Sequence, residues 1–444
     1  MRDKLEQDKK ETTIYRELGF RSLLPFIVFV IFYFGFAIAT KDFSKVPMTV
    51  AFLISSATAL ALNTREKLGT KLEVFAQGMG HKDIMIMCLI FILAGAFTAT
   101  SKAVGGIDSV VKIACHIIPP NLTTAGLFIT SALISLAVGT SCGTIAAIVP
   151  IAVSLSQALG LNPAVLIGAT VGGAMFGDNL SLISDTTIAS TRSQNVEMKD
   201  KMICNFKIVA IPAILCASIY MLPMFSHATG NAHLESIGFD NIIKILPYIL
   251  LLIFGILGVN VMFLLLAGTA FNIITGVCYK IFDIFTGFIY IGDGTVEMAT
   301  TIIVAMLAGG LLILVKSHGG ITYIITETGK RIKDKKSCEI GICFLVGITN
   351  LFTANNTVAI ITSGGIAKEL SKKYDVSPQR TASLLDITSC CVQGIIPYGA
   401  QILIATSLAS SVAVSSFAIM QYMFYPILMI FGLGFSILFT ANKK

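Results

Sequence analysis

The sequence predicts an all-α polytopic membrane protein, and its composition and its apolar runs carry this prediction. Hydrophobic residues make up 55% of the 444-residue chain and charged residues only 13%, whereas soluble domains carry about 25% charged residues. The apolar residues form continuous runs of about 20, the length of a membrane-spanning helix. Segments of about ten residues with alternating polarity, typical of an outer-membrane barrel, are absent from the sequence. We therefore expect a helical bundle whose main partner is the lipid bilayer.

About ten runs are long enough to be transmembrane helices. They divide the chain into an N-terminal tail, residues 1–21, and a single membrane domain, residues 22–440. The predicted spans are 22–40, 47–63, 84–100, 164–191, 203–224, 242–257, 261–278, 298–315, 382–408 and 417–440. Two more apolar stretches, 122–160 and 338–367, are interrupted by clusters of small polar residues.

The basic residues lie mainly in short loops between these spans. Residues 1–21 carry six Lys or Arg and residues 330–336 carry five, whereas 227–240 and 284–315 carry none. Because cytoplasmic loops are enriched in Lys and Arg, we expect both termini in the cytoplasm and a location in a bacterial-type inner membrane. The same loops account for the net charge of +7, so we do not expect nucleic-acid binding.

This orientation requires the stretches 122–160 and 338–367 to enter and leave the membrane on the same face. If both crossed fully, the basic loops 192–207 and 368–380 would lie outside. We therefore expect two re-entrant hairpins. Non-helical backbone at membrane depth is tolerated only where it is buried in protein or lines a watery cavity, so each hairpin tip indicates part of a transport path.

The two halves of the chain contain the same motifs in the same order. One set recurs 214 residues later: Leu93-Ala94-Gly95, Lys102 and Gly105-Gly106-Ile107 become Leu307-Ala308-Gly309, Lys316 and Gly319-Gly320-Ile321. The same offset places the first hairpin tip, 139–143, on the second, 353–357. A slip of one residue then places 184–186 on 397–399.

The basic loops make the first span of each half run in opposite directions, so we expect two inverted repeats, about 84–207 and 298–412. Each repeat would contain a helix broken by small polar residues. Inverted repeats with broken helices are typical of secondary transporters, whose site lies between the repeats near the midplane. The sequence therefore predicts a secondary active transporter that works by alternating access.

Three carboxylates, Asp178, Asp185 and Asp386, fall inside predicted spans. A charge at this depth costs roughly 2.5–3.5 kcal/mol even on lenient scales and usually faces a binding site or a water-filled path. Asp178 and Asp185 are about two helical turns apart if the helix is intact, and we consider them Na⁺ ligands. Two alternatives stay open: one Asp caps a half-helix, and Asp386 pairs with Arg380.

The remaining candidate ligands are hydroxyl and amide side chains of the two tips and the two broken spans. They are Thr140, Ser141, Thr144, Asn179, Ser181, Thr186, Thr187, Asn355, Asn356, Thr357, Tyr398 and Gln401. The first tip is also compatible with a small-residue packing face, and the second with a helix-capping turn.

Other function classes find no support in the motifs. The ten cysteines form no CxxC pair, the five histidines form no metal-binding pattern, and the sequence has no GxxxxGK[ST] nucleotide loop. We therefore expect neither an enzyme nor an ATP-driven pump, and no cofactor apart from Na⁺ and H⁺ as transported ions. A homodimer is one assembly that we consider.

Two motifs carry a resemblance to a known family. The segments GTSCGT at 139–144 and FGDNLSLISDTT at 176–187 resemble the NhaC-type Na⁺/H⁺ antiporter family of the ion-transporter superfamily. Cys142 and Leu182 depart from its pattern, where Trp and Pro are common. So does Tyr398, where Trp is frequent.

The resemblance implies Na⁺/H⁺ exchange through the carboxylates, with Na⁺ and the proton competing for the same group. Members of this family also include exchangers of malate and lactate and suspected amino-acid carriers. The alternative is therefore a Na⁺-coupled carrier of a small organic anion or amino acid.

Overall fold

The computed structural model describes residues 18–40, 46–117, 119–182, 184–226, 238–256, 259–329 and 332–440. Most of the predicted N-terminal tail lies outside these residues. Within them the chain is helical and contains no strand. Eight helical segments of the described chain are long and apolar enough to cross a membrane, and four shorter helices are also apolar. The polytopic all-α fold predicted from the sequence is confirmed.

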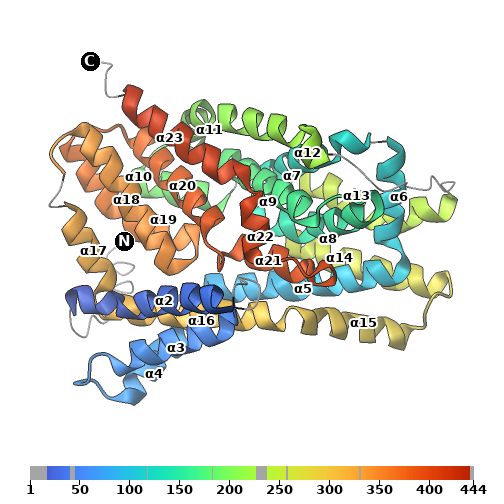
Figure 1. The fold of residues 1–444 in the computed structure, drawn as a ribbon, viewed down its shortest axis with the longest axis horizontal. Coiled ribbons are helices and arrows are strands. Elements are labelled where there is room, and N and C mark those ends of the chain that lie inside the picture. The colour runs from blue at the N-terminus through green and yellow to red at the C-terminus, as the bar shows by residue number, and fades with distance from the viewer. Residues whose placement is uncertain are drawn as a thin grey trace.

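Residues 19–226 provide the first half of the bundle (Figure 1). Their elements are η1 (Gly19–Leu23), α2 (Leu24–Thr40), α3 (Met48–Ala61), α4 (Leu68–Met79), α5 (Lys82–Val104), α6 (Gly106–Ile117), η3 (Pro120–Leu122), α7 (Thr123–Val138), α8 (Ser141–Leu159), α9 (Pro163–Leu180), α10 (Asp185–Gln194), α11 (Met198–Tyr220) and α12 (Pro223–Ser226).

The remaining elements form the second half of the bundle. These elements are α13 (Phe239–Ile256), α14 (Val261–Cys278), α15 (Ile284–Glu297), α16 (Ala299–Ser317), α17 (Gly320–Gly329), α18 (Lys335–Thr353), α19 (Asn356–Lys373), α20 (Pro378–Ile395), α21 (Ala400–Leu408), η4 (Ser410–Val412), α22 (Ser416–Gln421) and α23 (Phe424–Thr440).

Three predicted spans are divided in the structure, and the sequence predicts a break in the first two of them. The span 164–191 is divided into α9 and α10, and 382–408 into α20 and α21. The span 417–440 is likewise divided into α22 and α23. Helix α15 was not among the predicted spans, because its glycines and acidic residues lower its hydropathy. Gly294 of α15 instead allows close packing, since a Cβ there would overlap the backbone of Gly95 on α5.

Both interrupted apolar stretches form a pair of helices with the polar cluster at the turn. At the first turn Gly139 has a φ of 76° and Thr140 caps α8. At the second, Ala354 has a φ of 48° and Asn355 caps α19. Figure 1 shows α7 and α8 toward the end of the molecule that carries α6, and α18 and α19 toward the end that carries α17. The two pairs therefore approach the centre from opposite ends.

The matching turns correct the register of the repeat. Equivalent positions at the tips are 215 residues apart, because Gly139 matches Ala354 and Thr140 matches Asn355. The first residues of α9 and α20, Pro163 and Pro378, follow the same offset. The offset read from the Gly-Gly motifs matched the first tip to second-half residues that lie one position too early. It matched residues 184–186 to second-half residues that lie two positions too early. One extra residue lies between Gly319 and the second tip.

Helix α9 reaches the centre because it packs tightly on α7. A Cβ added to Gly173 would overlap the carbonyl oxygen of Phe128, and one added to Gly177 would overlap that of Ala132. Small residues four apart allow such a close approach of membrane helices. The packing fixes the last turn of α9, which carries Asp178, beside the tip between α7 and α8.

Candidate functional site

A cavity of about 610 Å³, here named the central cavity, lies where the two tips and the two helix breaks meet. Its lining includes Gly139, Thr140, Ser141, Cys142, Asp178, Ser184, Asp185, Thr186, Ala354, Asn355, Asn356, Thr357, Gln393, Ala400 and Gln401. Lys82 and Arg192 line it as well and are exposed, whereas Asp178 is only 7% exposed. The cavity therefore runs from the molecular surface to a buried carboxylate.

Four helix N-termini and four helix C-termini converge at the central cavity. The N-termini belong to α8, α10, α19 and α21, and the C-termini to α7, α9, α18 and α20. Helix ends leave backbone N–H or C=O groups without intrahelical partners, and they carry partial positive and negative charge respectively. The site can therefore stabilise either a cation or a carboxylate.

Asp178 is the centre of a hydrogen-bond network that joins the two repeats. Its Oδ2 accepts from Ser141 Oγ at 2.9 Å and its Oδ1 from Ser184 Oγ at 2.6 Å. Ser141 Oγ in turn accepts from Gln401 Nε2 at 3.1 Å. Ser184 also shares a hydrogen bond of 2.9 Å with Thr186. One carboxylate is thus held by a tip, a helix break and, through Ser141, the opposite repeat.

The second repeat contributes amides to the central cavity. Gln393 Nε2 donates to the Ala354 carbonyl at 2.8 Å. The Oε1 atoms of Gln393 and Gln401 are both buried and have no hydrogen-bond partner among the described residues. Buried polar atoms normally have a partner, so these two oxygens are available to a bound cation.

Asp185 and Asp178 lie on different helices, because the chain is broken between Leu180 and Asp185. The helix is therefore not intact between them, and the two-turn spacing considered for an intact helix does not apply. Asp185 is an exposed residue in the first turn of α10 and lines the central cavity. The helix dipole stabilises a negative charge in this first turn. Ser184 occupies the N-cap position of α10, so neither Asp178 nor Asp185 caps this helix.

Five further predicted residues lie outside the cavity lining and hold the backbone around it. Thr144 donates to the Thr140 carbonyl at 3.0 Å, and Thr187 donates to that of Ser181 at 2.8 Å. Asn179 contacts Tyr425 Oη at 3.2 Å. Tyr398 Oη donates to the Leu351 carbonyl at 2.7 Å. These contacts tie the tips and breaks to adjacent turns and to helices α18 and α23.

Asp386 also lies outside the cavity lining, and its partner is not Arg380, the alternative considered from the sequence. Its Oδ2 forms an ion pair of 2.6 Å with Lys201, and both side chains are fully buried. Arg380 instead pairs with Glu339 at 2.8 Å. Lys201 Nζ also donates to Thr187 Oγ1 at 2.8 Å and to the Asn179 carbonyl at 3.3 Å. The pair therefore supports both sides of the α9–α10 break.

With this geometry in view, comparison with known proteins identifies the family. A model of the Na⁺/H⁺ antiporter family matches residues 9–224 and 237–440. The chain belongs to this family. It is a family of transporters, and the resemblance noted from the tip and break motifs is confirmed.

Curated relatives match over most of their length. The Malate-2H(+)/Na(+)-lactate antiporter of Bacillus subtilis is 19% identical, over 97% of this chain and 96% of the relative. The Na(+)/H(+) antiporter NhaC of the same organism is 23% identical, over 80% and 84%. The Arginine/ornithine antiporter ArcD of Halobacterium salinarum is 21% identical, over 79% and 77%.

Several residues around the site of this antiporter-family chain were missed at the sequence level. Ser184, in the motif at 176–187, and Gln393, in the predicted span 382–408, were not selected as ligands. Lys82, Arg192 and Lys201 were counted only as loop charges that set the orientation. Lys201 lies inside α11, four residues before Asn205, which donates to Asp386 Oδ2 at 2.7 Å. The i, i+4 spacing of two polar residues on an apolar helix was the available signal.

Proposed function

We propose that the protein is a Na⁺/H⁺ antiporter of a bacterial-type inner membrane, with both termini in the cytoplasm. The observation that carries this proposal is Asp178, a buried carboxylate at the end of the central cavity, held between two repeats of a Na⁺/H⁺ antiporter family member. No cofactor other than the exchanged ions is needed.

In this mechanism Na⁺ and the proton compete for Asp178. A Na⁺ ion bound beside the ionised carboxylate would find hard oxygen ligands in Asp178, Gln393 and Gln401, the donor type that such cations prefer. Protonation removes the negative charge and with it the main attraction for the ion. Each binding event therefore expels the other occupant.

Ser141 and Ser184 suit both states of this exchange. A hydroxyl is both a donor and an acceptor, so each serine can donate to the carboxylate, as observed, or accept from the carboxylic acid. The network therefore needs no change of side-chain position when the proton arrives. The Lys201–Asp386 pair positions the break and does not touch the ion.

The second candidate is a Na⁺-coupled carrier of a small organic anion or amino acid. Its specific support is the size of the central cavity, about 610 Å³, which falls within the range of roughly 300–1,000 Å³ found for small-molecule sites. Lys82 and Arg192 at its mouth and the four helix N-termini would attract a carboxylate. Two relatives carry names of organic-acid or amino-acid antiporters.

Proteoliposomes that contain only the purified protein and a pH-sensitive dye separate the candidates. Addition of Na⁺, with no organic solute, is expected to move protons in the wild type and to give only the signal of empty liposomes in Asp178→Asn. The matched variant Asp185→Asn is expected to retain exchange. Its half-maximal Na⁺ concentration should rise about fivefold, because an exposed charge contributes at most ~1 kcal/mol.

A wild-type protein that stays silent under these conditions contradicts the antiporter proposal. If Na⁺-dependent uptake then appears when a labelled hydroxy acid or amino acid is supplied, the second candidate replaces it. Full exchange by Asp178→Asn would show that the ion binds elsewhere.

A further inference from the structure

A second cavity of about 480 Å³, here named the hydroxyl cavity, has a different chemistry from the central cavity. Eight of its lining residues are Ser or Thr: Thr49, Thr300, Thr301, Thr406, Ser407, Ser410, Ser415 and Ser416. None of its described lining residues is charged. Neutral hydroxyl oxygens can replace part of the hydration shell of a cation without holding it strongly.

The two cavities lie on either side of the short helix α21. Ala400 and Gln401 in its first turn line the central cavity, whereas Leu403, Thr406 and Ser407 line the hydroxyl cavity. A helix has 3.6 residues per turn, so the two linings are about half a turn to two turns apart along α21. Ile402 and Ile404 of this segment are fully buried and contribute to an apolar barrier.

Aromatic rings extend this barrier toward α2. The Phe29 ring lies 4.9 Å from the ring centroid of Tyr398, which precedes α21, and 4.6 Å from that of Phe52. Phe29 also stacks on Tyr33 at 6.2 Å, and Tyr33 lines the hydroxyl cavity. A continuous row of rings therefore runs from Tyr398, next to α21, to Tyr33 in the wall of the hydroxyl cavity.

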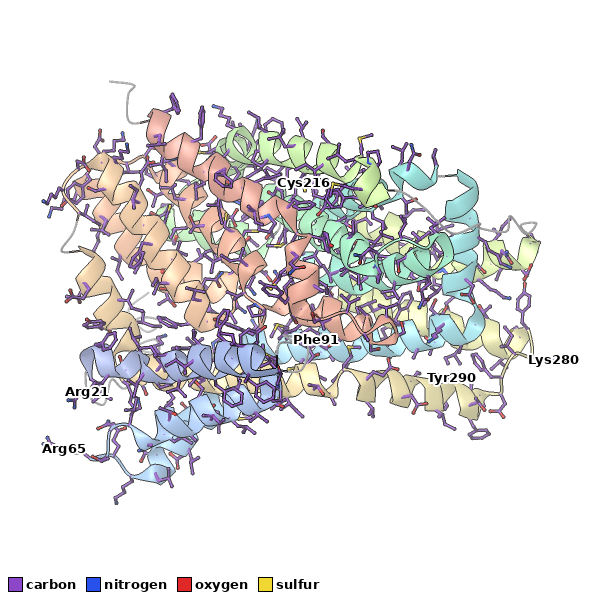
Figure 2. All side chains as sticks on the ribbon, in the orientation of Figure 1. Arg21, Arg65, Phe91, Cys216, Lys280 and Tyr290 are labelled. Carbon is purple, nitrogen blue, oxygen red and sulfur yellow. The ribbon has the colours of Figure 1, made fainter. Side chains whose placement is uncertain are left out.

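The charge pattern places the two cavities on opposite faces of the membrane. Three elements at the central cavity, α5, α10 and α19, have their outer ends at basic loops, which marks the cytoplasmic face. The hydroxyl cavity is formed by the end of α2, the start of α16 and the end of α21, which the same pattern puts outside. In Figure 2, Arg21 and Arg65, from two of the basic segments, lie at one end of the molecule. Lys280, between α14 and α15, lies at the other end.

The internal repeat relates the two cavities. The position 215 residues after Arg192 is Ser407, and these residues line the central and the hydroxyl cavity respectively. The outer half of α10 thus serves the first cavity as the outer half of α21 serves the second. Two equivalent half-helices leading away from one centre, toward opposite faces, are the arrangement that alternating access requires.

We propose that the hydroxyl cavity is the outward-facing half of the ion path, which takes the hydrated Na⁺ ion. In this proposal the structure is inward-open, and the first turns of α21, with Phe29, Phe52 and Tyr398, form its closed outer gate. Contact between Thr301 and Ser407 across the cavity links α16 to α21 beside this gate. This inference rests on the proposed function.

Thiol accessibility in proteoliposomes of known orientation tests the proposal. In Ser407→Cys, a membrane-impermeant cationic methanethiosulfonate applied outside is expected to modify the new thiol and to reduce Na⁺-driven proton exchange at least tenfold. External Na⁺ should slow this modification. Because Ser407 contacts Thr301, Thr49→Cys on α3 provides a second position in the same cavity that leaves this contact intact.

Ser411→Cys is the matched control, since Ser411 is exposed next to Ser410 but does not line the hydroxyl cavity. Its modification should leave exchange unchanged, as should treatment of the wild type, which accounts for the native cysteines. Modification of both cavity variants from the inside only, or external modification without inhibition, would overturn the proposal.

The mass shift of the labelled protein is measured independently of transport. A wild type that exchanges no ions while both cavity thiols are labelled from outside contradicts the proposed function but supports an outward-facing cavity. Active variants labelled only from inside contradict the cavity assignment and leave the function intact.

Discussion

The two halves of the central cavity have the same backbone arrangement, a tip and a helix break, but different side chains. In the first half, Ser141 and Asp178 provide a hydroxyl and a carboxylate, whereas the positions 215 residues later carry Asn356 and Gln393. Likewise Thr186 of the first half is matched by Gln401. Each pair lies at the same place relative to a tip or a helix break.

This difference separates two tasks that an exchanger must combine. A carboxylate changes charge when it binds a proton, whereas an amide offers an oxygen that does not titrate in this way. In the proposed mechanism the first half therefore exchanges Na⁺ for a proton, and the second half offers neutral ligands. An ion bound between them also links two repeats that must move relative to each other.

The largest effect is expected when the chemistry of the halves is exchanged. The double variant Asp178→Gln, Gln393→Asp keeps one carboxylate in the cavity but places it beside the Ala354 carbonyl, which now accepts from Gln393 at 2.8 Å. Two acceptors would then face each other, and the serine donors would lie on the other half. We expect proton exchange to fall to the level of empty liposomes.

Gln393→Asn is the control, because it keeps an amide and should retain exchange with weaker Na⁺ binding. If the double variant exchanges ions as well as this control, the halves are interchangeable and the division of tasks is wrong.

A smaller but still large effect concerns the buried ion pair that joins the halves, Lys201 on α11 and Asp386 on α20. Lys201→Met leaves a buried carboxylate without its counter-charge, and loss of one partner of such a pair typically costs about 3–5 kcal/mol. We expect a marked decrease in the thermal unfolding midpoint in detergent.

The double variant Lys201→Met, Asp386→Leu removes both charges and should recover most of this stability. It should also retain Na⁺/H⁺ exchange, because Asp178 remains. A stable double variant without exchange would assign the pair a direct part in ion or proton movement.

The Lys201–Asp386 pair also shows which features of the fold the sequence patterns do not predict. Continuous apolar runs predicted the bundle, and the polar clusters within them predicted the tips and breaks, because both are local consequences of the membrane environment. Asp178 was selected because a charge at that depth has few structural uses. Nine of the fifteen candidate residues line one cavity, although no pattern stated that the two tips would meet.

Partners across the fold were not predictable in the same way. For Asp386, nearby Arg380 was the one ion-pair partner considered, yet the chain brings Lys201, 185 positions away, to 2.6 Å. Lys201 was counted with the lysines of the loop 192–207. The sequence alone does not show that α11 begins at Met198 and buries this lysine. The repeat offset was misjudged because one inserted residue leaves the Gly-Gly motifs aligned and shifts everything that follows.

The smallest effect is expected outside the membrane, where the first helices of the two hairpins differ. Helix α7 begins without a side-chain cap, whereas Asp334 caps α18 and receives hydrogen bonds from the backbone and side chain of Ser337. These bonds, the side-chain bond first, hold the pKa of the Asp334 carboxyl below its usual value. A lowered pKa in the folded state means that ionised Asp334 stabilises the protein above the unfolded-state pKa of about 3.9. The stabilisation disappears as the pH falls through the folded pKa.

Asp334→Ala should therefore lower the unfolding midpoint slightly at pH 7 and not at pH 2, while the matched Asp334→Asn keeps a good N-cap and should stay close to the wild type at pH 7. Thermal unfolding of the three proteins in detergent at both pH values measures this. An equal deficit of Asp334→Ala at both pH values would mean that the carboxylate charge contributes nothing, and that the two hairpins do not differ in this electrostatic respect.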